Sequence, residues 1–171
     1  KVVALLEKLR KCLGELPVLF TFRSSREGGE AALSDGAYQS LNEAAIASGF
    51  VDCVDVELFS GDAVAKAVVA AAHSNHVKVI ASNHDFEKTP AAEELLARLQ
   101  KMEALGADIP KIAVMPQSSK DVLTLLTVTE SWKETGKTPV ITMSMAGEGL
   151  ISRLCGEIFG SAVNLCAAGK S

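Results

Sequence analysis

The chain has 171 residues, of which 48% are hydrophobic and 22% are charged, and its formal net charge is −4. A chain of this length can bury one sizeable core, so we predict a single domain over residues 1–171. The acidic balance and the scattered lysines and arginines argue against a nucleic-acid partner. The sequence also has no run of about 18 apolar residues, so we expect no membrane span.

Helical and strand patterns alternate along the chain. Amphipathic or capped segments predict helices at 1–13, 34–49, 61–75, 89–106, 118–136 and 149–160. Short apolar segments predict strands at 17–23, 51–59, 77–85, 111–116, 139–145 and 162–169. The clearest helix is 89–106, with Thr89 as N-cap, Pro90 at the first helical position and Gly106 at the end.

This alternation predicts an α/β fold made of parallel β-α units. An open doubly wound sheet would need a glycine-rich dinucleotide loop after the first strand, and "TFRSSREGGE" is not such a loop. A (β/α)8 TIM barrel of about 250 residues uses about 31 residues per unit, so this chain holds about five and a half units. We therefore expect a barrel with about six strands, lacking two strands and its last helix.

Two residue types need separate interpretation. The four cysteines, Cys12, Cys53, Cys155 and Cys166, are far apart and form no C-x-x-C pair, which predicts free thiols and a reducing, cytoplasmic setting. His73 and His76 have no third ligand nearby, so we interpret them as exposed imidazoles at a helix end rather than as a metal site.

Polar residues recur where the predicted strands end, the position of reactive groups in a barrel. They are Arg23 and Glu27 after the first strand, Asp55 and Glu57 on the second, and Asn83, His84 and Asp85 on the third. We interpret Asp55 and Glu57 as structural ion-pair partners. His84 is either catalytic or a loop-capping residue, and Glu27 is either a site acid or a loop acid near Arg26.

Lys111 opens the apolar strand "KIAVMP". Alternation places Lys111, Ala113 and Met115 on one face of the strand, and the apolar residues between them suit a helix layer, so we predict that Lys111 points into the barrel. Desolvation would lower the pKa of its ammonium group and leave a nucleophilic amine. The alternatives are a surface lysine or an internal one paired with Asp55 or Glu57, and the pattern alone leaves them open.

Six segments together resemble the type I 3-dehydroquinate dehydratase family: "FTFRSSREGGE", "VDVELF", "SNHDFEKTP", "GADIPKIAVMP", "ITMSM" and "ISRLCGEIFGSA". The resemblance implies a (β/α)8 barrel, usually a homodimer, that needs neither a metal nor an organic cofactor. Its small-molecule substrate is 3-dehydroquinate, which it dehydrates to 3-dehydroshikimate in the shikimate route to aromatic amino acids. A class I aldolase or transaldolase-like barrel, and an inactive truncated barrel serving as an interaction module, are the alternatives.

The resemblance also implies a role for individual residues. Lys111 forms the imine with the substrate ketone, His84 is the general acid and base, and Glu27 orients His84. The residues that contact the substrate are Arg153 at the carboxylate, Arg23 at the hydroxyls, and Met143, Met145 and Phe86 along the pocket.

Members of this family carry two further strands before the part that the chain matches, the second ending in an acidic residue and an arginine that bind the substrate. After the last strand they carry a loop with a serine and a glutamine that closes over it. None of these is in the sequence. We therefore expect the chain to be a fragment of a longer protein.

Overall fold

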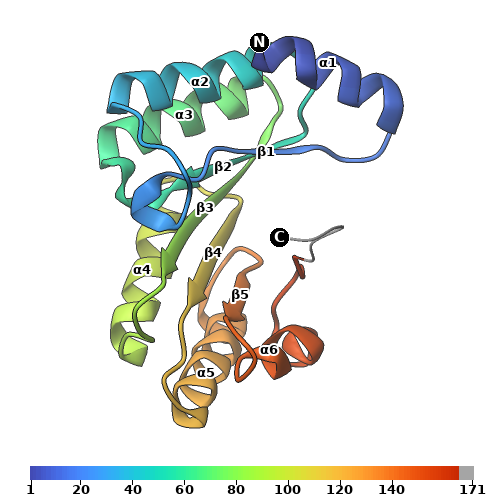
Figure 1. The fold of residues 1–171 in the computed structure, drawn as a ribbon. Helices are drawn as coiled ribbons and strands as arrows, with labels where there is room; N and C mark the ends of the chain where they lie inside the picture. The colour runs from blue at the N-terminus through green and yellow to red at the C-terminus, as the bar shows by residue number, and fades with distance from the viewer. Residues whose placement is uncertain (166–171) are drawn as a thin grey trace. The chain divides into compact units, whose positions relative to one another are not determined.

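The computed structural model describes residues 1–165, and these residues divide into two compact units (Figure 1). The first unit comprises Lys1–Asn83 and Met102–Asp108. The second comprises His84–Lys101 and the residues from Ile109 onward.

The strands confirm the predicted α/β class. They are β1 (Leu19–Thr21), β2 (Cys53–Glu57), β3 (Lys78–Asp85), β4 (Ile109–Val114) and β5 (Ile141–Ser144), in one sheet whose order follows the chain. The pairs β1–β2, β2–β3 and β4–β5 are parallel. Sequence neighbours that are also sheet neighbours are what repeated β-α units produce, and this order agrees with a partial barrel.

The first unit builds its core from β2, the start of β3 and the helices that connect the strands. Its helices are α1 (Val2–Leu13), α2 (Asp35–Ala47) and α3 (Asp62–Ser74), with 3-10 turns η1 (Ser25–Glu27) and η2 (Leu58–Ser60). Figure 1 shows α2 and α3 side by side. Val54 of β2, Val79 of β3 and Val68 of the covering helix α3 are fully buried, so the strands have the apolar character of a covered parallel sheet.

The second unit contains the end of β3, most of α4 (Ala92–Ala104), β4, α5 (Ser119–Thr135), β5, α6 (Leu150–Leu154) and α7 (Gly156–Phe159). Its core holds Leu95 and Leu99 of α4, Ile112 of β4, and Leu125 and Ile141, all fully buried. The helical periodicity of α4 and α5 therefore points their apolar faces inward, as their sequence pattern predicts.

Three predicted elements differ from the observed ones by more than two residues at an end. The helix expected at 89–106 begins at Ala92, because the Thr89 hydroxyl donates a hydrogen bond to the Met115 carbonyl (3.1 Å) instead of capping a helix. The helix expected at 149–160 is two short helices, because the backbone at Cys155 (φ −117°, ψ 8°) leaves the helical region.

The third difference is the last predicted strand. Residues 162–165 form no strand, and 166–169 lie outside the described residues, so five strands are described where about six were expected. Among residues 1–165, the strand pairing of this region is an isolated parallel bridge between Val140 and Ser161.

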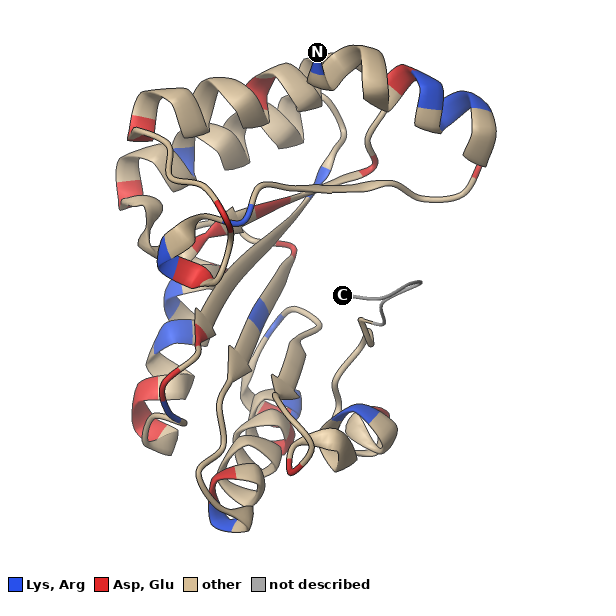
Figure 2. Ribbon diagram, viewed as in Figure 1, with Lys and Arg blue, Asp and Glu red and all other residues tan. Residues whose placement is uncertain are grey.

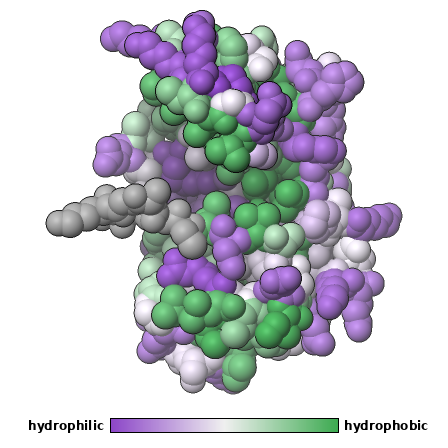
Figure 3. Space-filling model, turned by 90° about the vertical axis from the view of Figure 1, so that its right-hand side faces the viewer, coloured by the Kyte–Doolittle hydropathy of each residue, from purple (hydrophilic) through white to green (hydrophobic). Residues whose placement is uncertain are grey.

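The surface of α6 and α7 is notably apolar. Leu154 and Ile158 are 72% and 73% exposed, and Leu150 and Ile151 are each 46% exposed. Figure 3, which shows the side that faces right in Figure 1, has a hydrophobic area toward its lower end, where these helices lie. Within residues 1–165, no helix has the length and apolar character needed to cross a membrane.

Candidate functional site

Lys111 lies in the middle of β4 with only 6% of its surface exposed. Its strand neighbours Ile112, Ala113 and Val114 are also buried, and in the parallel register Lys111 pairs with Ile141 of β5. The interpretation as a surface lysine is therefore wrong. A long amine-bearing side chain is carried into the interior, where water no longer solvates it.

The amine of Lys111 lies next to His84. Lys111 Nζ is 3.1 Å from His84 Nε2, and His84 comes from the end of β3. The Met115 N–H donates to the Asp85 carbonyl (2.9 Å), which ties the two strand ends together within the second unit. An amine and an imidazole at this distance can pass a proton between them, which is the geometry that general acid-base chemistry requires.

An aromatic ring holds the imidazole from one side. Phe86 stacks on His84 with a centroid distance of 6.4 Å and an interplanar angle of 19°. Phe86 itself is 47% exposed. The three side chains Lys111, His84 and Phe86 therefore form one contiguous group in the second unit.

Two methionines and an arginine come from elements that follow β4. Met143 of β5 pairs with Ala113 in the register, and the Met145 N–H donates to the Val114 carbonyl (2.8 Å). Arg153 lies on α6, and its Nε is buried with no hydrogen-bond partner among residues 1–165. A buried guanidinium nitrogen with spare donor capacity is a feature that an acidic ligand would stabilise.

The first unit holds a separate charged cluster around Arg23. Arg23 Nη2 donates to Asp55 Oδ2 (2.8 Å), and Nη1 donates to Glu57 Oε1 (2.9 Å) and Glu27 Oε2 (3.3 Å). Each of the three carboxylate side chains is at most 5% exposed. Figure 2 shows the acidic positions along β2. The prediction that Asp55 and Glu57 form ion pairs is confirmed, and the structure supplies Arg23 as their partner.

The charges in this cluster determine the protonation of Arg23. Burial by itself lowers the pKa of the guanidinium, but the charges of Asp55, Glu57 and Glu27 outweigh burial and raise its pKa above the ordinary value. Arg23 is therefore a permanent cation among three carboxylates.

A tight turn carries Glu27. It is the last residue of η1, and its carboxylate accepts a hydrogen bond from Asn83 Nδ2 (3.4 Å). The turn closes on itself through Gly29, whose N–H donates to the Ser24 carbonyl (2.8 Å). A Cβ at Gly29 would lie 1.8 Å from the Arg23 carbonyl oxygen, so only glycine permits this close approach.

The predicted site residues thus fall into two groups. The second unit contains Lys111, His84, Phe86, Met143, Met145 and Arg153, and the first contains Arg23 and Glu27. The sequence did not indicate two hydroxyl groups of the first cluster, Ser24 and Ser82. Serines are common in loops and strands, so only their buried contacts distinguish these two.

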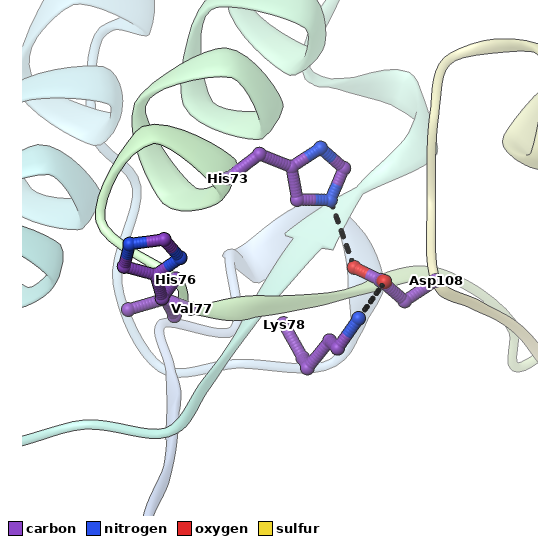
Figure 4. A pocket seen from close by; sticks show the side chains of 5 residues that line it. All are labelled: His73, His76, Val77, Lys78 and Asp108. Atoms are coloured by element: carbon purple, nitrogen blue, oxygen red, sulfur yellow. Dashed lines mark hydrogen bonds and ion pairs between the residues drawn. The ribbon is translucent and has the colours of Figure 1, made fainter.

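His73 and His76, which we interpreted as exposed imidazoles at a helix end, line a surface hollow of the first unit (Figure 4). His73 Nε2 is 2.9 Å from Asp108 Oδ2, and Lys78 Nζ donates to Asp108 Oδ1 (2.8 Å). Burial raises the pKa of the Asp108 carboxyl, but the hydrogen bonds from Lys78 and His73 outweigh it, and the pKa is lowered. This hollow is an ion-paired surface feature.

With this geometry established, comparison with known proteins decides the family. The family described as type I 3-dehydroquinase matches residues 1–171. The chain belongs to the type I 3-dehydroquinase family. The resemblance predicted from six sequence segments is therefore confirmed.

Similar proteins carry the corresponding name. A 3-dehydroquinate dehydratase of Listeria monocytogenes serotype 4b (strain CLIP80459) is 57% identical over 171 residues, which is all of this chain and 68% of the relative. A 3-dehydroquinate dehydratase of Escherichia coli O139:H28 (strain E24377A / ETEC) is 58% identical over 171 residues, covering 99% of this chain and 68% of the relative.

Solved structures agree with the family and the fold. The type I 3-dehydroquinate dehydratase of Clostridium difficile, solved with covalently modified comenic acid, has a TM-score of 0.96 and 55% identity over 98% of this chain. The 3-dehydroquinate dehydratase of Geobacillus kaustophilus HTA426 has a TM-score of 0.96 and 43% identity over 99% of this chain. The chain spans 66% of each of these two structures, slightly less than two thirds of their length.

Proposed function

We propose that this member of the type I 3-dehydroquinase family dehydrates 3-dehydroquinate to 3-dehydroshikimate through an imine on Lys111. The observation that carries this proposal is the buried Lys111 amine 3.1 Å from the His84 imidazole. A desolvated amine is a stronger nucleophile because the uncharged form is favoured, and a neighbouring imidazole can remove and return protons. Family membership supplies the substrate.

In the proposed reaction the Lys111 amine attacks the ketone carbon, and the resulting carbinolamine loses water to give a protonated imine. His84 removes a proton from the carbon beside the imine, and the electron pair moves toward the imine nitrogen to form an enamine. The β-hydroxyl then leaves with a proton from His84, so one water molecule departs. A second water hydrolyses the product imine and restores the free amine. The protonated imine is the electron sink that makes the C–H proton removable.

The remaining site residues have supporting roles in this proposal. Arg153 binds the substrate carboxylate as a planar two-point donor, and Arg23 contacts the substrate hydroxyls. Glu27 orients the His84 imidazole. Met143, Met145 and Phe86 line the pocket.

The proposal includes the setting of the enzyme. Residues 1–171 act as part of one catalytic domain in a cytoplasmic homodimer, without a metal, an organic cofactor, a nucleic acid or a membrane as partner. Sedimentation velocity of the protein expressed from its full open reading frame tests the dimer, and a single species of monomer mass would contradict it.

Borohydride reduction tests the chemistry directly. The protein is mixed with 3-dehydroquinate, reduced with sodium borohydride and digested, and the peptide containing Lys111 is examined by mass spectrometry. We expect that peptide to carry the mass of the reduced ligand, and the Lys111→Ala protein to carry none. An adduct formed only with a sugar phosphate would indicate aldolase chemistry instead, and no adduct with either compound would contradict the imine.

A further inference from the structure

Glu57 of β2 connects two residues that the proposed function places in the site. Its Oε1 accepts hydrogen bonds from Arg23 Nη1 (2.9 Å) and from the Ser24 N–H (2.7 Å). Its Oε2 accepts from the Ser24 hydroxyl (2.6 Å). Both oxygens of one buried carboxylate are therefore used, and all three donors belong to the segment that leads into η1.

Ser24 is the residue on which that turn closes. The Ser24 carbonyl accepts hydrogen bonds from the Glu27 N–H (3.0 Å) and the Gly29 N–H (2.8 Å). A displacement of Ser24 consequently displaces the backbone that carries Glu27. The same displacement moves Arg23, the residue immediately before it.

The neighbouring acid Asp55 has a narrower role. It accepts from Arg23 Nη2 (2.8 Å) and from the Ser82 hydroxyl, and so holds the arginine side chain. Glu57 differs because it also binds main chain. Its own N–H donates to the Tyr38 hydroxyl (3.0 Å), which ties this point of β2 to α2.

We propose that Glu57 is a positioning residue for the dehydration, holding Arg23 and the turn that carries Glu27 in the one geometry that the substrate requires. This proposal rests on the proposed function, because Arg23 and Glu27 matter only if the chain binds and dehydrates 3-dehydroquinate. A carboxylate is needed because both oxygens must accept. A glutamine would present an NH2 group to the Ser24 hydroxyl.

The test compares four variants of the protein expressed from its full open reading frame. Glu57→Gln keeps the size of the side chain and removes one hydrogen-bond acceptor. Glu57→Asp keeps the charge, but its side chain is one methylene shorter, so the carboxylate lies further from Arg23 and Ser24. Ser24→Ala removes a single donor and leaves the carboxylate in place. Glu30→Gln is the matched control, since Glu30 is an exposed acid of the same loop.

The readouts separate positioning from folding. Borohydride trapping at saturating 3-dehydroquinate counts the chains able to form the imine, and steady-state kinetics over a pH series gives kcat and KM per competent chain. Misplacing a site group by about 1 Å can cost about a hundredfold in rate. We therefore expect both Glu57 variants to lose about tenfold to a hundredfold in kcat/KM per trapped chain, with a raised KM and an altered pH profile of kcat. Glu30→Gln should match the wild type.

Each other outcome is also decisive. Turnover could fall only in proportion to the fraction of chains trapped by borohydride, with KM and the pH profile unchanged. That result shows a structural role for Glu57 and overturns the proposal. If neither Glu57 variant folds, the Ser24→Ala variant tests the proposal instead. A KM and a pH profile equal to those of the wild type in that variant overturn the proposal. If the wild type is active and the Glu57 variants keep its kcat/KM, the positioning role of Glu57 is contradicted and the proposed dehydration is not. A wild type that is neither trapped nor active contradicts the proposed function, and the Glu57 role falls with it.

Discussion

Replacing Lys111 with methionine is expected to remove activity and to make the protein more stable. Methionine keeps an unbranched apolar side chain of similar length and lacks the amine. Lys111 is 6% exposed, so its amine has lost most of its hydration in the folded state. The unfolded chain solvates that amine fully, whereas an apolar methionine side chain gains free energy from the same burial. We therefore expect the methionine variant to be more stable by about 1 kcal/mol, which for a chain of this size is about 2–4 °C in Tm.

Urea unfolding followed by circular dichroism measures this difference. The matched control is Lys120→Met, because Lys120 is exposed on α5 and its substitution should change the free energy of unfolding by less than about 0.5 kcal/mol. Turnover is followed in parallel through the absorbance of the conjugated product. A Lys111→Met protein less stable than wild type by about 2 kcal/mol or more would refute the reasoning, because a stabilising ion-pair role, as in the alternative with Asp55 or Glu57, would then apply. Retained turnover would refute the imine.

His84→Ala should lower kcat by about a hundredfold or more, the usual contribution of general acid-base catalysis, and wild-type kcat in that variant would remove His84 from the mechanism. Gly29→Ala should lower the free energy of unfolding by about 1–3 kcal/mol, since its Cβ meets the Arg23 carbonyl at 1.8 Å, whereas Gly36→Ala, with open space around its Cβ, should be neutral or slightly stabilising. Equal stabilities in urea would contradict the assigned crowding. The Asp108 carboxyl has a pKa below its ordinary 3.8, so it stabilises the fold above that pH and the stabilisation is lost as pH falls through the folded pKa. The stability difference between wild type and Asp108→Asn should therefore shrink below about pH 4, and a difference that grows there would contradict the assignment.

Most of the fold could be predicted from local patterns. Short apolar segments between the predicted helices indicated each described strand to within a few residues. The helix predicted at 34–49 is α2, which Ser34 caps by accepting a hydrogen bond from the Ala37 N–H (3.4 Å). Helix ends were less accurate where a distant partner competes for the capping group. Threonine is a common N-cap residue, yet the Thr89 hydroxyl donates to the carbonyl of Met115, which lies 26 residues further along the chain.

The candidate site shows the same division between local and distant information. Strand alternation already predicted that Lys111 points inward, because the residues on the opposite face of the strand, Ile112 and Val114, are both apolar and suit a helix layer. Asp55 and Glu57 were predicted as ion-pair partners, but the partner itself, Arg23, lies 32 and 34 residues away. No periodicity in the sequence specifies which cation meets which acid.

The order of the β-α units, the family, and the candidate lysine and histidine could all be predicted from the amino-acid sequence. These depend on periods of two and 3.6 residues and on short motifs, all of which are local. Only the tertiary structure brought Lys111 within 3.1 Å of His84, surrounded Arg23 with three buried carboxylates, and made Glu57 the anchor of the turn that carries Glu27. Hydrogen bonds act over about 3 Å in space regardless of separation along the chain, so these contacts exist only once the strands are paired.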